Sequence, residues 1–178
     1  AHLGANVLGA HAITNNLDSL AYMIPLGLGQ ALTIKVSHAM GRGDPLDARQ
    51  ICLTGFKLVF VLALILGSIK ILLRHDFAEM FSPEPEVQVI AASLFFFSAA
   101  LGCFDSMQMA ASGALRGYKD ARVPLIIQII AFWMIAFPIA YSLALTDFWG
   151  EPIGVYGFWI GLVIAACLAS MMLLYRWN

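Results

Sequence analysis

Asp105 lies inside a long apolar segment, where an ionised side chain is costly and usually functional. Four polar or small residues flank it at helical steps of three and four and therefore share its face: Ser98 and Gly102 before it, and Gln108 and Ser112 after it. A carboxylate beside hydroxyls and an amide can bind a small cation or take up a proton. The sequence leaves a structural alternative open, in which Asp105 bonds a neighbouring helix or caps a break. We take Asp105 and Gln108 as candidate cation-binding or substrate-binding residues.

A second polar stripe lies near the start of the chain, where Asn15, Asp18, Tyr22, Pro25 and Gly29 again follow at steps of three and four. Tyr22 could present its ring to an organic cation or its hydroxyl to an ion; a packed core tyrosine is the alternative. Pro25 removes a backbone hydrogen bond and should bend its helix. Asp18 is expected near a helix end, where a solvated aspartate is favoured over a ligand, although it stays a candidate.

The amino-acid composition indicates which medium surrounds these polar groups. Of 178 residues, 61% are hydrophobic and 12% are charged, against about 25% charged in a soluble domain. The apolar excess must face lipid, so the lipid bilayer is the expected partner. A net charge of −1 offers no electrostatic footprint for nucleic acid, which is excluded as a partner.

The elements that carry the stripes are expected to be membrane-spanning helices. A bilayer needs about 20 mostly apolar residues per helix, and runs such as LVFVLALILG lack the alternation of membrane strands. The predicted fold class is an all-α polytopic membrane protein. Five segments have the required length, with short polar loops between them: about Ala12–Val36, Ile51–Leu73, Val87–Leu115, Val123–Leu145 and Gly154–Tyr175.

The lysines and arginines are distributed unevenly and predict an orientation. Eight belong to the first and third loops, their flanks and the C-terminus: Lys35, Arg42, Arg49, Lys57, Arg116, Lys119, Arg122 and Arg176. The second and fourth loops hold only Lys70 and Arg74. Because positive loops stay on the cytoplasmic side, the C-terminus is expected in the cytoplasm. Aromatic anchors are expected at Phe148–Trp149 outside and at Tyr175–Trp177 inside.

Catalytic and cofactor motifs are missing from the sequence. It contains no HExxH, GxSxG, P-loop or CxxC motif, so we expect neither an enzyme nor a bound cofactor. Trp133 and Pro138 are expected to pack and to kink the fourth span. Gly154, Gly157 and Gly161 are expected to permit close helix contact. Asp120 is expected to tether a neighbouring cation.

Three motifs together carry a family resemblance. Gly9–Asp44 reads GAHAITNNLDSLAYMIPLGLGQALTIKVSHAMGRGD, Asp105–Arg122 follows D-x-x-Q-x-x-x-x-G-x-LRGYKD-x-(R/K), and Gly157–Leu162 reads GFWIGL. In order and spacing, across the whole chain, they resemble the multidrug and toxic compound extrusion (MATE) transporters, bacterial NorM-type branch. That branch has a pattern close to AHQ-(I/V)-x-x-N-x-S-S-x-x-(Y/F)-M-(I/L)-P at its eighth helix.

The resemblance implies a twelve-helix transporter made of two six-helix lobes. Residues 1–178 would be a partial C-terminal lobe, with the five spans as helices eight to twelve and residues 1–9 joining helix seven. Helix seven and the N-terminal lobe would belong to the same protein outside this chain. The implied location is the bacterial inner (plasma) membrane.

The resemblance also implies site roles. The family exports cationic or amphipathic drugs in exchange for Na⁺ or H⁺. Asp105 matches a helix-ten aspartate of the cation site and is a possible Na⁺ ligand, while Tyr22 matches an aromatic residue proposed to contact that cation. Glu84 aligns with an acidic position implicated in binding in some members. Ala12 and Asp18 depart from the usual Gln and Ser, which leaves the local ion preference open.

Two alternative functions stay open. One is a flippase for lipid-linked precursors of the same superfamily, which would need a large basic cavity that the spans do not predict. The other is a membrane structural subunit without transport activity, in which Asp105 would tolerate replacement by Asn.

Overall fold

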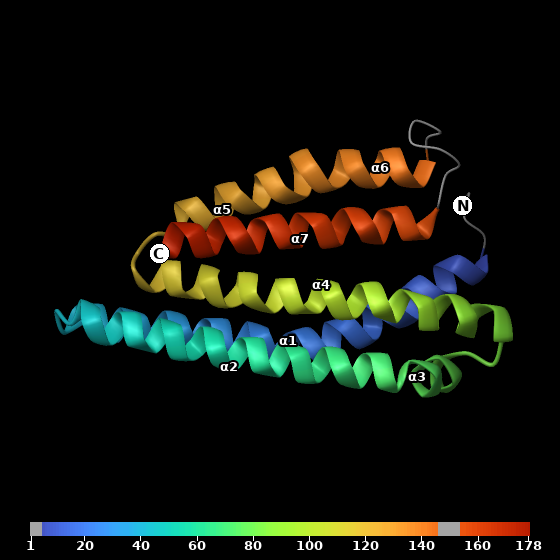
Figure 1. The fold of residues 1–178 in the computed structure, drawn as a ribbon, viewed down its shortest axis with the longest axis horizontal. Coiled ribbons are helices and arrows are strands. Elements are labelled where there is room, and N and C mark those ends of the chain that lie inside the picture. The colour runs from blue at the N-terminus through green and yellow to red at the C-terminus, as the bar shows by residue number, and fades with distance from the viewer. Residues whose placement is uncertain (1–4, 146–153) are drawn as a thin grey trace.

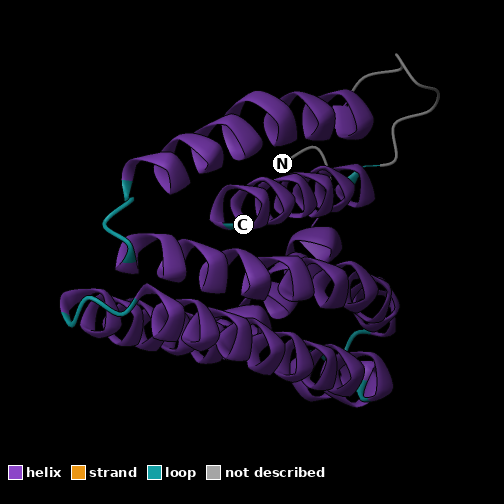
Figure 2. Ribbon diagram, turned by 60° about the vertical axis from the view of Figure 1, so that its left-hand side comes forward, coloured by secondary structure: helices purple, strands orange, loops and turns teal. Residues whose placement is uncertain are grey.

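The computed structural model describes residues 5–145 and 154–178, and in these ranges it contains helices and short connections but no strand (Figures 1 and 2). The predicted all-α class is confirmed. The helices are α1 (Ala5–Gly41), α2 (Pro45–Leu72), α3 (Arg74–Phe81), α4 (Pro85–Gly117), α5 (Arg122–Ile129), the π-helix η1 (Ile130–Ala136), α6 (Phe137–Leu145) and α7 (Val155–Trp177). The segments α5, η1 and α6 follow without a break and form one rod.

The predicted number of membrane spans needs a correction. Four stretches are long and apolar enough to cross a membrane: Pro45–Leu72, Pro85–Gly117, Arg122–Ala144 and Val155–Trp177. The first predicted span lies in α1, which has ample length at 37 residues but is not one of the four. Its polar stripe, with Asn15, Asp18 and neighbouring polar residues, lowers its hydropathy.

The second predicted loop contains a helix that its sequence did not predict. Residues 74–81 form α3, a short amphipathic helix that contacts α4. Two turns of helix that begin with three polar residues resemble a polar loop in sequence, and their helical state depends on packing. The first loop ends in a capped helix start: the Asp44 side chain accepts a hydrogen bond from the Asp47 N–H at 2.9 Å, and Pro45 begins α2.

The long rods run in alternating directions and lie side by side (Figure 1). Helices α1, α4 and α7 run parallel to one another, whereas α2 and the α5–α6 rod run in the opposite direction. Helix α4 is central, because it contacts α1, α2, α3 and α7. The α5–α6 rod lies beyond α7 and packs on it.

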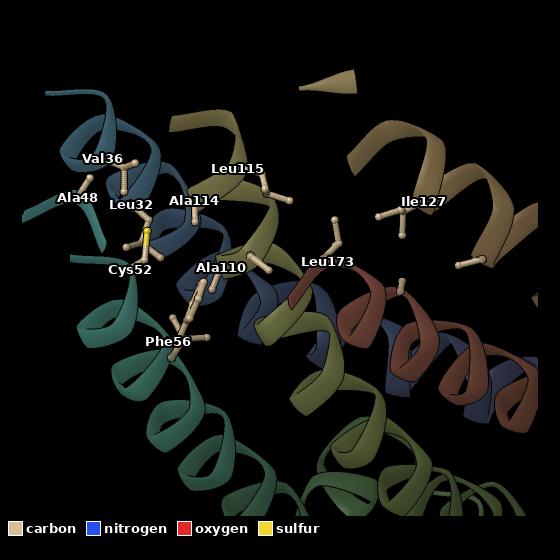
Figure 3. Packing of buried hydrophobic residues seen from close by; sticks show 14 of the residues in the cluster. Leu32, Val36, Ala48, Cys52, Phe56, Ala110, Ala114, Leu115, Ile127 and Leu173 are labelled. Atoms are coloured by element: carbon tan, nitrogen blue, oxygen red, sulfur yellow. The ribbon is translucent and has the colours of Figure 1, made fainter. Parts of the chain in front are cut away.

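Buried apolar side chains form two separate clusters along α4. The α4 C-terminal cluster gathers residues from α1, α2, the carboxyl-terminal end of α4, α5, η1 and α7, and Figure 3 shows how Cys52, Ala110 and Leu115 point into it. The α4 N-terminal cluster lies at the other end of the helix and includes Phe95 and Trp159. The layer of α4 from about residue 99 to 106 contributes no fully buried side chain to either cluster, although Leu101 packs against the α4 N-terminal cluster.

Glycine allows α1 and α4 to touch beside the α4 C-terminal cluster. A Cβ atom on Gly113 would lie 2.2 Å from the Gly29 carbonyl oxygen, so the two backbones meet there without side chains between them. Thr33 Oγ1 donates to the Gly113 carbonyl at 2.9 Å and closes the same contact. This half of the α1–α4 interface is tightly packed.

The α6–α7 contact also depends on glycine. Cβ atoms on Gly157 and Gly161 would lie 2.7 Å and 2.9 Å from atoms of Leu143 and Ala140. This confirms the close approach expected at these two positions, whereas Gly154 precedes α7 with a positive φ of 59°. Trp133, in η1, was expected to pack, but it is 74% exposed.

The structure tests the aromatic membrane anchors and the Asp120 ion pair that the sequence predicted. Phe148–Trp149 lies outside the described residues. Tyr175 is exposed, while Trp177 packs edge-on against Phe56 with ring centroids 4.9 Å apart. Asp120 does hold a cation: Arg176 Nη2 lies 2.9 Å from its Oδ2, which ties the loop after α4 to the end of α7.

Candidate functional site

A cavity of about 420 Å³ lies between α1, α2 and α4. Its lining comes from residues 15–26 of α1, 63–70 of α2 and 99–106 of α4, which is the layer between the two apolar clusters. Most of the lining is apolar, with polar groups converging from all three helices, as in many ligand sites. The polar side chains that line it are Asn15, Asp18, Ser19, Tyr22, Lys70, Asp105 and Ser106.

Lys70, Asp18 and Ser98 form a closed triangle of hydrogen bonds beside the cavity. Lys70 Nζ donates to Asp18 Oδ1 at 2.5 Å and to Ser98 Oγ at 3.2 Å, and the Ser98 hydroxyl donates to the same Asp18 oxygen at 2.5 Å. The Lys70 side chain is 9% exposed and that of Asp18 is 22% exposed. Burial removes water from both charges, and the pair is retained because each charge has a partner.

This triangle corrects two expectations from the sequence. Lys70 was counted with the second loop, but it lies in the last turn of α2 and is buried. Asp18 was favoured as a solvated helix-end aspartate, but it lies well inside α1 and forms a partly buried ion pair. Both errors have one cause: hydropathy and charge counts place residues along a helix and carry no information about which helices face each other.

Asp105 also lines the cavity, from α4. Its carboxylate accepts no hydrogen bond from any residue in the described part of the chain, and it is only partly buried. Gly102, one turn earlier on the same helix, lines the cavity without a side chain. The Asp105 carboxylate is therefore open to the cavity, in contrast to the paired Asp18.

Tyr22 lines the same cavity one helical turn after Asp18. The structure thus brings together Asp18, Tyr22 and Asp105, which the sequence suggested on two separate helices. Their carboxylate and hydroxyl oxygens are the kind of donor that hard cations prefer. A tyrosine ring beside two carboxylates also suits an organic cation.

The other two candidates lie elsewhere. Gln108 is 2% exposed on α4 and does not line the cavity, and its Oε1 has no hydrogen-bond partner among the described residues. Glu84 is the exposed residue before α4, at the opposite end of the α4 N-terminal cluster from Asp105. Ser98 shares the predicted stripe, but it bonds Asp18 and Lys70 rather than Asp105.

Lys70 is the site residue that the sequence reasoning overlooked. Its signal was present, because a lysine four residues before the next arginine lay within a predicted apolar span. Among the described residues, no group of three or more His, Cys, Asp or Glu side chains is positioned to hold a metal ion together. The cavity combines two carboxylates, one ammonium group and one phenol, which suits reversible cation binding more than a tight metal centre.

Comparison with known proteins identifies relatives of the whole chain. The MatE family model matches residues 1–142. The multidrug resistance protein PmpM of Pseudomonas aeruginosa is 44% identical over 98% of this chain, and the multidrug resistance protein NorM of Photobacterium profundum is 37% identical over 98%. The chain spans 36% and 38% of the lengths of these two relatives.

Solved structures agree on the fold. The eukaryotic MATE transporter AtDTX14 superposes with a TM-score of 0.88 at 26% identity, covering 96% of this chain and 37% of that one. The MATE transporter ClbM in complex with Rb⁺ also gives 0.88, at 18% identity, covering 99% of this chain and 40% of that one. The family match, the two relatives and the shared fold lead to one conclusion: this chain belongs to the MatE family of transporters.

Proposed function

We propose that the chain is part of the C-terminal lobe of a secondary antiporter, which exports cationic or amphipathic compounds in exchange for Na⁺ or H⁺. Helix seven and the N-terminal lobe would complete the transporter. Asp105 would bind the coupling ion and the cationic drug in competition, with Tyr22 and Asp18 beside it. Coupling requires only that ion and drug favour different conformations of the transporter.

One observation carries this proposal. The Asp105 carboxylate, inside a bundle that faces lipid, is open to a cavity and accepts no hydrogen bond from the described residues. A structural aspartate in a membrane protein is normally paired with a neighbouring group. An aspartate that is left without a hydrogen-bond donor beside a cavity is suited to receive a mobile cation.

The charge distribution supports a location and an orientation. Six of the eight lysines and arginines of the predicted cytoplasmic set lie in or within about five residues of the α1–α2 connection, the α4–α5 connection and the C-terminus: Arg42, Arg49, Arg116, Lys119, Arg122 and Arg176. Figure 1 shows these three parts of the chain at the same end of the bundle, and Lys35 and Lys57 lie farther inside α1 and α2. We place that end in the cytoplasm of a bacterial cell, with the protein in the inner membrane. The membrane potential then supplies about 2.3 kcal/mol per charge per 100 mV to drive inward cation movement.

Replacing Asp105 with Asn in the intact transporter tests the proposal. Efflux of a fluorescent cation such as ethidium from cells should fall to the level of cells without the protein, since Asn keeps the shape and removes the charge. Asp120→Asn is the matched control, because it makes the same chemical change in the connection between α4 and α5 and should retain efflux.

The amount of protein in the membrane must be equal in all strains. Near-normal efflux by Asp105→Asn would overturn the assignment and would favour a structural role for this aspartate. Varying the Na⁺ and pH gradients separately would then identify the coupling ion of the wild-type protein.

A further inference from the structure

The formal charges of the described side chains that line the cavity do not sum to zero. The described residues contribute two carboxylates, Asp18 and Asp105, and one ammonium group, Lys70. Two negative charges and one positive charge leave a formal sum of −1. Although Lys70 lies in the last turn of α2, it offsets half of the negative charge that this cavity would otherwise present.

The contacts of Lys70 fix where its charge lies. The ammonium group bonds Asp18 and Ser98, which anchor it against α1 and α4. Only Asp18 Oδ1 takes part, so Oδ2 accepts no hydrogen bond from the described residues. The 9% exposure of the Lys70 side chain withdraws the charge from bulk water, and a charge in such surroundings acts more strongly on its neighbours than one at a surface.

The path from Lys70 toward Asp105 is open. A Cβ atom placed on Gly102 would lie 3.7 Å from Lys70 Nζ, so the ammonium group lies directly over this glycine. Gly102 precedes Asp105 by one turn on the same face of α4. Gly102 places no side chain between the two groups, and the lysine stem is flexible enough to swing between acidic partners.

We propose that Lys70 is a tethered cation that sets the charge of the transport cavity, so that the cavity binds one fewer positive charge than its two aspartates would attract. Asp18 is the positioning residue that keeps the ammonium group away from Asp105. This inference rests on the proposed function, in which Asp105 receives the transported cation. It adds that binding strength at Asp105 is set by a lysine on another helix.

The proposal predicts changes of opposite sign from two neighbouring substitutions. Lys70→Met removes the positive charge, keeps the apolar stem and should strengthen binding of an organic cation about tenfold. Asp18→Asn releases the ammonium group toward Asp105 and should weaken binding about tenfold. The double variant leaves Asp105 as the one charge in the described lining, and should bind within about threefold of the wild type.

The measurement is the dissociation constant of tetraphenylphosphonium for the purified intact transporter in detergent, at fixed pH and without Na⁺. Lys57→Met is the matched control, because Lys57 lies on the same helix, is exposed and does not line the cavity. It should leave the dissociation constant unchanged. Lys70→Arg keeps the charge and should stay close to the wild type.

If Lys70→Met gives no monodisperse protein, Asp18→Asn against the double variant decides the question: removing the ammonium group should rescue the binding that Asp18→Asn loses. Equal dissociation constants for these two variants would then overturn the inference.

A simple structural ion pair would behave differently. It would make Lys70→Met and Asp18→Asn change binding in the same direction or not at all, and either result overturns the inference. This failure is distinct from that of the proposed function. If Asp105→Asn abolishes efflux while the two substitutions agree in sign, only the role of Lys70 is wrong; if Asp105→Asn retains efflux, the proposed function itself is wrong.

Discussion

The two halves of the α1–α4 interface use opposite means to bring the same helices together. Beside the α4 C-terminal cluster, Gly29 meets Gly113 and the backbones touch, with Thr33 as the polar bridge. Toward the other end, Asp18 reaches α4 through Ser98 and α2 through Lys70, and a cavity opens beside them. Small residues make one half rigid, while charged side chains in the other leave space for a ligand.

This difference suggests that the two halves of the α1–α4 interface have different roles. Two helices whose backbones touch have one favourable relative position, because protein interiors are tightly packed and resist small displacements. Polar side chains around a cavity can exchange partners with little backbone movement. We infer that the glycine half holds the lobe together and that the cavity half carries the chemistry of transport.

The largest effect on stability is expected from Gly113→Ala in the glycine half. The new Cβ would lie 2.2 Å from the backbone oxygen of Gly29, which cannot give way as a flexible side chain could. Separating the helices should cost about 3 kcal/mol, the upper end of overpacking. The measurement is the temperature at which half of the detergent-solubilised intact protein aggregates.

Gly27→Ala is the matched control for that substitution. A Cβ on Gly27 meets nothing within 4 Å, although this glycine is only two residues from Gly29 on α1. It should leave the stability unchanged or slightly raise it, because alanine favours helix. Equal losses from both substitutions would show that the tight contact does not hold the helices.

A smaller loss is expected from Thr33→Val, which keeps the shape of the side chain and removes its donor. Thr33 Oγ1 bonds the carbonyl oxygens of both Gly29 and Gly113. Hydrogen bonds between membrane helices are worth about 0.6 kcal/mol on average, so the aggregation temperature should fall by less than for Gly113→Ala. A larger fall than for Gly113→Ala would reverse the ranking of packing over hydrogen bonding in this half.

The smallest effect is expected from Arg176→Ala. Its ion pair with Asp120 lies at the end of the bundle, and the Arg176 side chain is 56% exposed. Exposed pairs contribute about 0–1 kcal/mol, so the aggregation temperature should stay nearly unchanged. A fall comparable to that of Gly113→Ala would mean that the tie between α7 and the α4–α5 connection holds the lobe together.

The sequence predicted the features that depend on one helix at a time. Apolar length located four of the spans, and the cost of burying a carboxylate singled out Asp105. The features it missed depend on partners. Lys70 was counted with the second loop, although it lies in the predicted span Ile51–Leu73, because the sequence does not show that its counter-ion lies 52 positions away on another helix. The segment of α3 resembled a loop because its helical state depends on contact with α4.

The resemblance to a family contributed in a different way. It grouped Tyr22 with Asp105, and both residues line the same cavity, a grouping that periodicity alone could not provide across two helices. It could not indicate Lys70, because that residue belongs to none of the three family motifs. Residues that depart from a family pattern, such as Asp18, therefore need a structure to reveal what they pair with.

In the proposed mechanism, the charge of Asp105 couples an ion gradient to drug movement through the cavity half of the lobe. The most direct measurement is tetraphenylphosphonium transport by the intact protein in proteoliposomes, with and without an imposed Na⁺ or pH gradient. We predict that the gradient stimulates transport by the wild type and by Gly27→Ala, and that the stimulation disappears in Asp105→Asn. Undiminished stimulation in Asp105→Asn would show that the charge of Asp105 does not couple the ion gradient to drug movement.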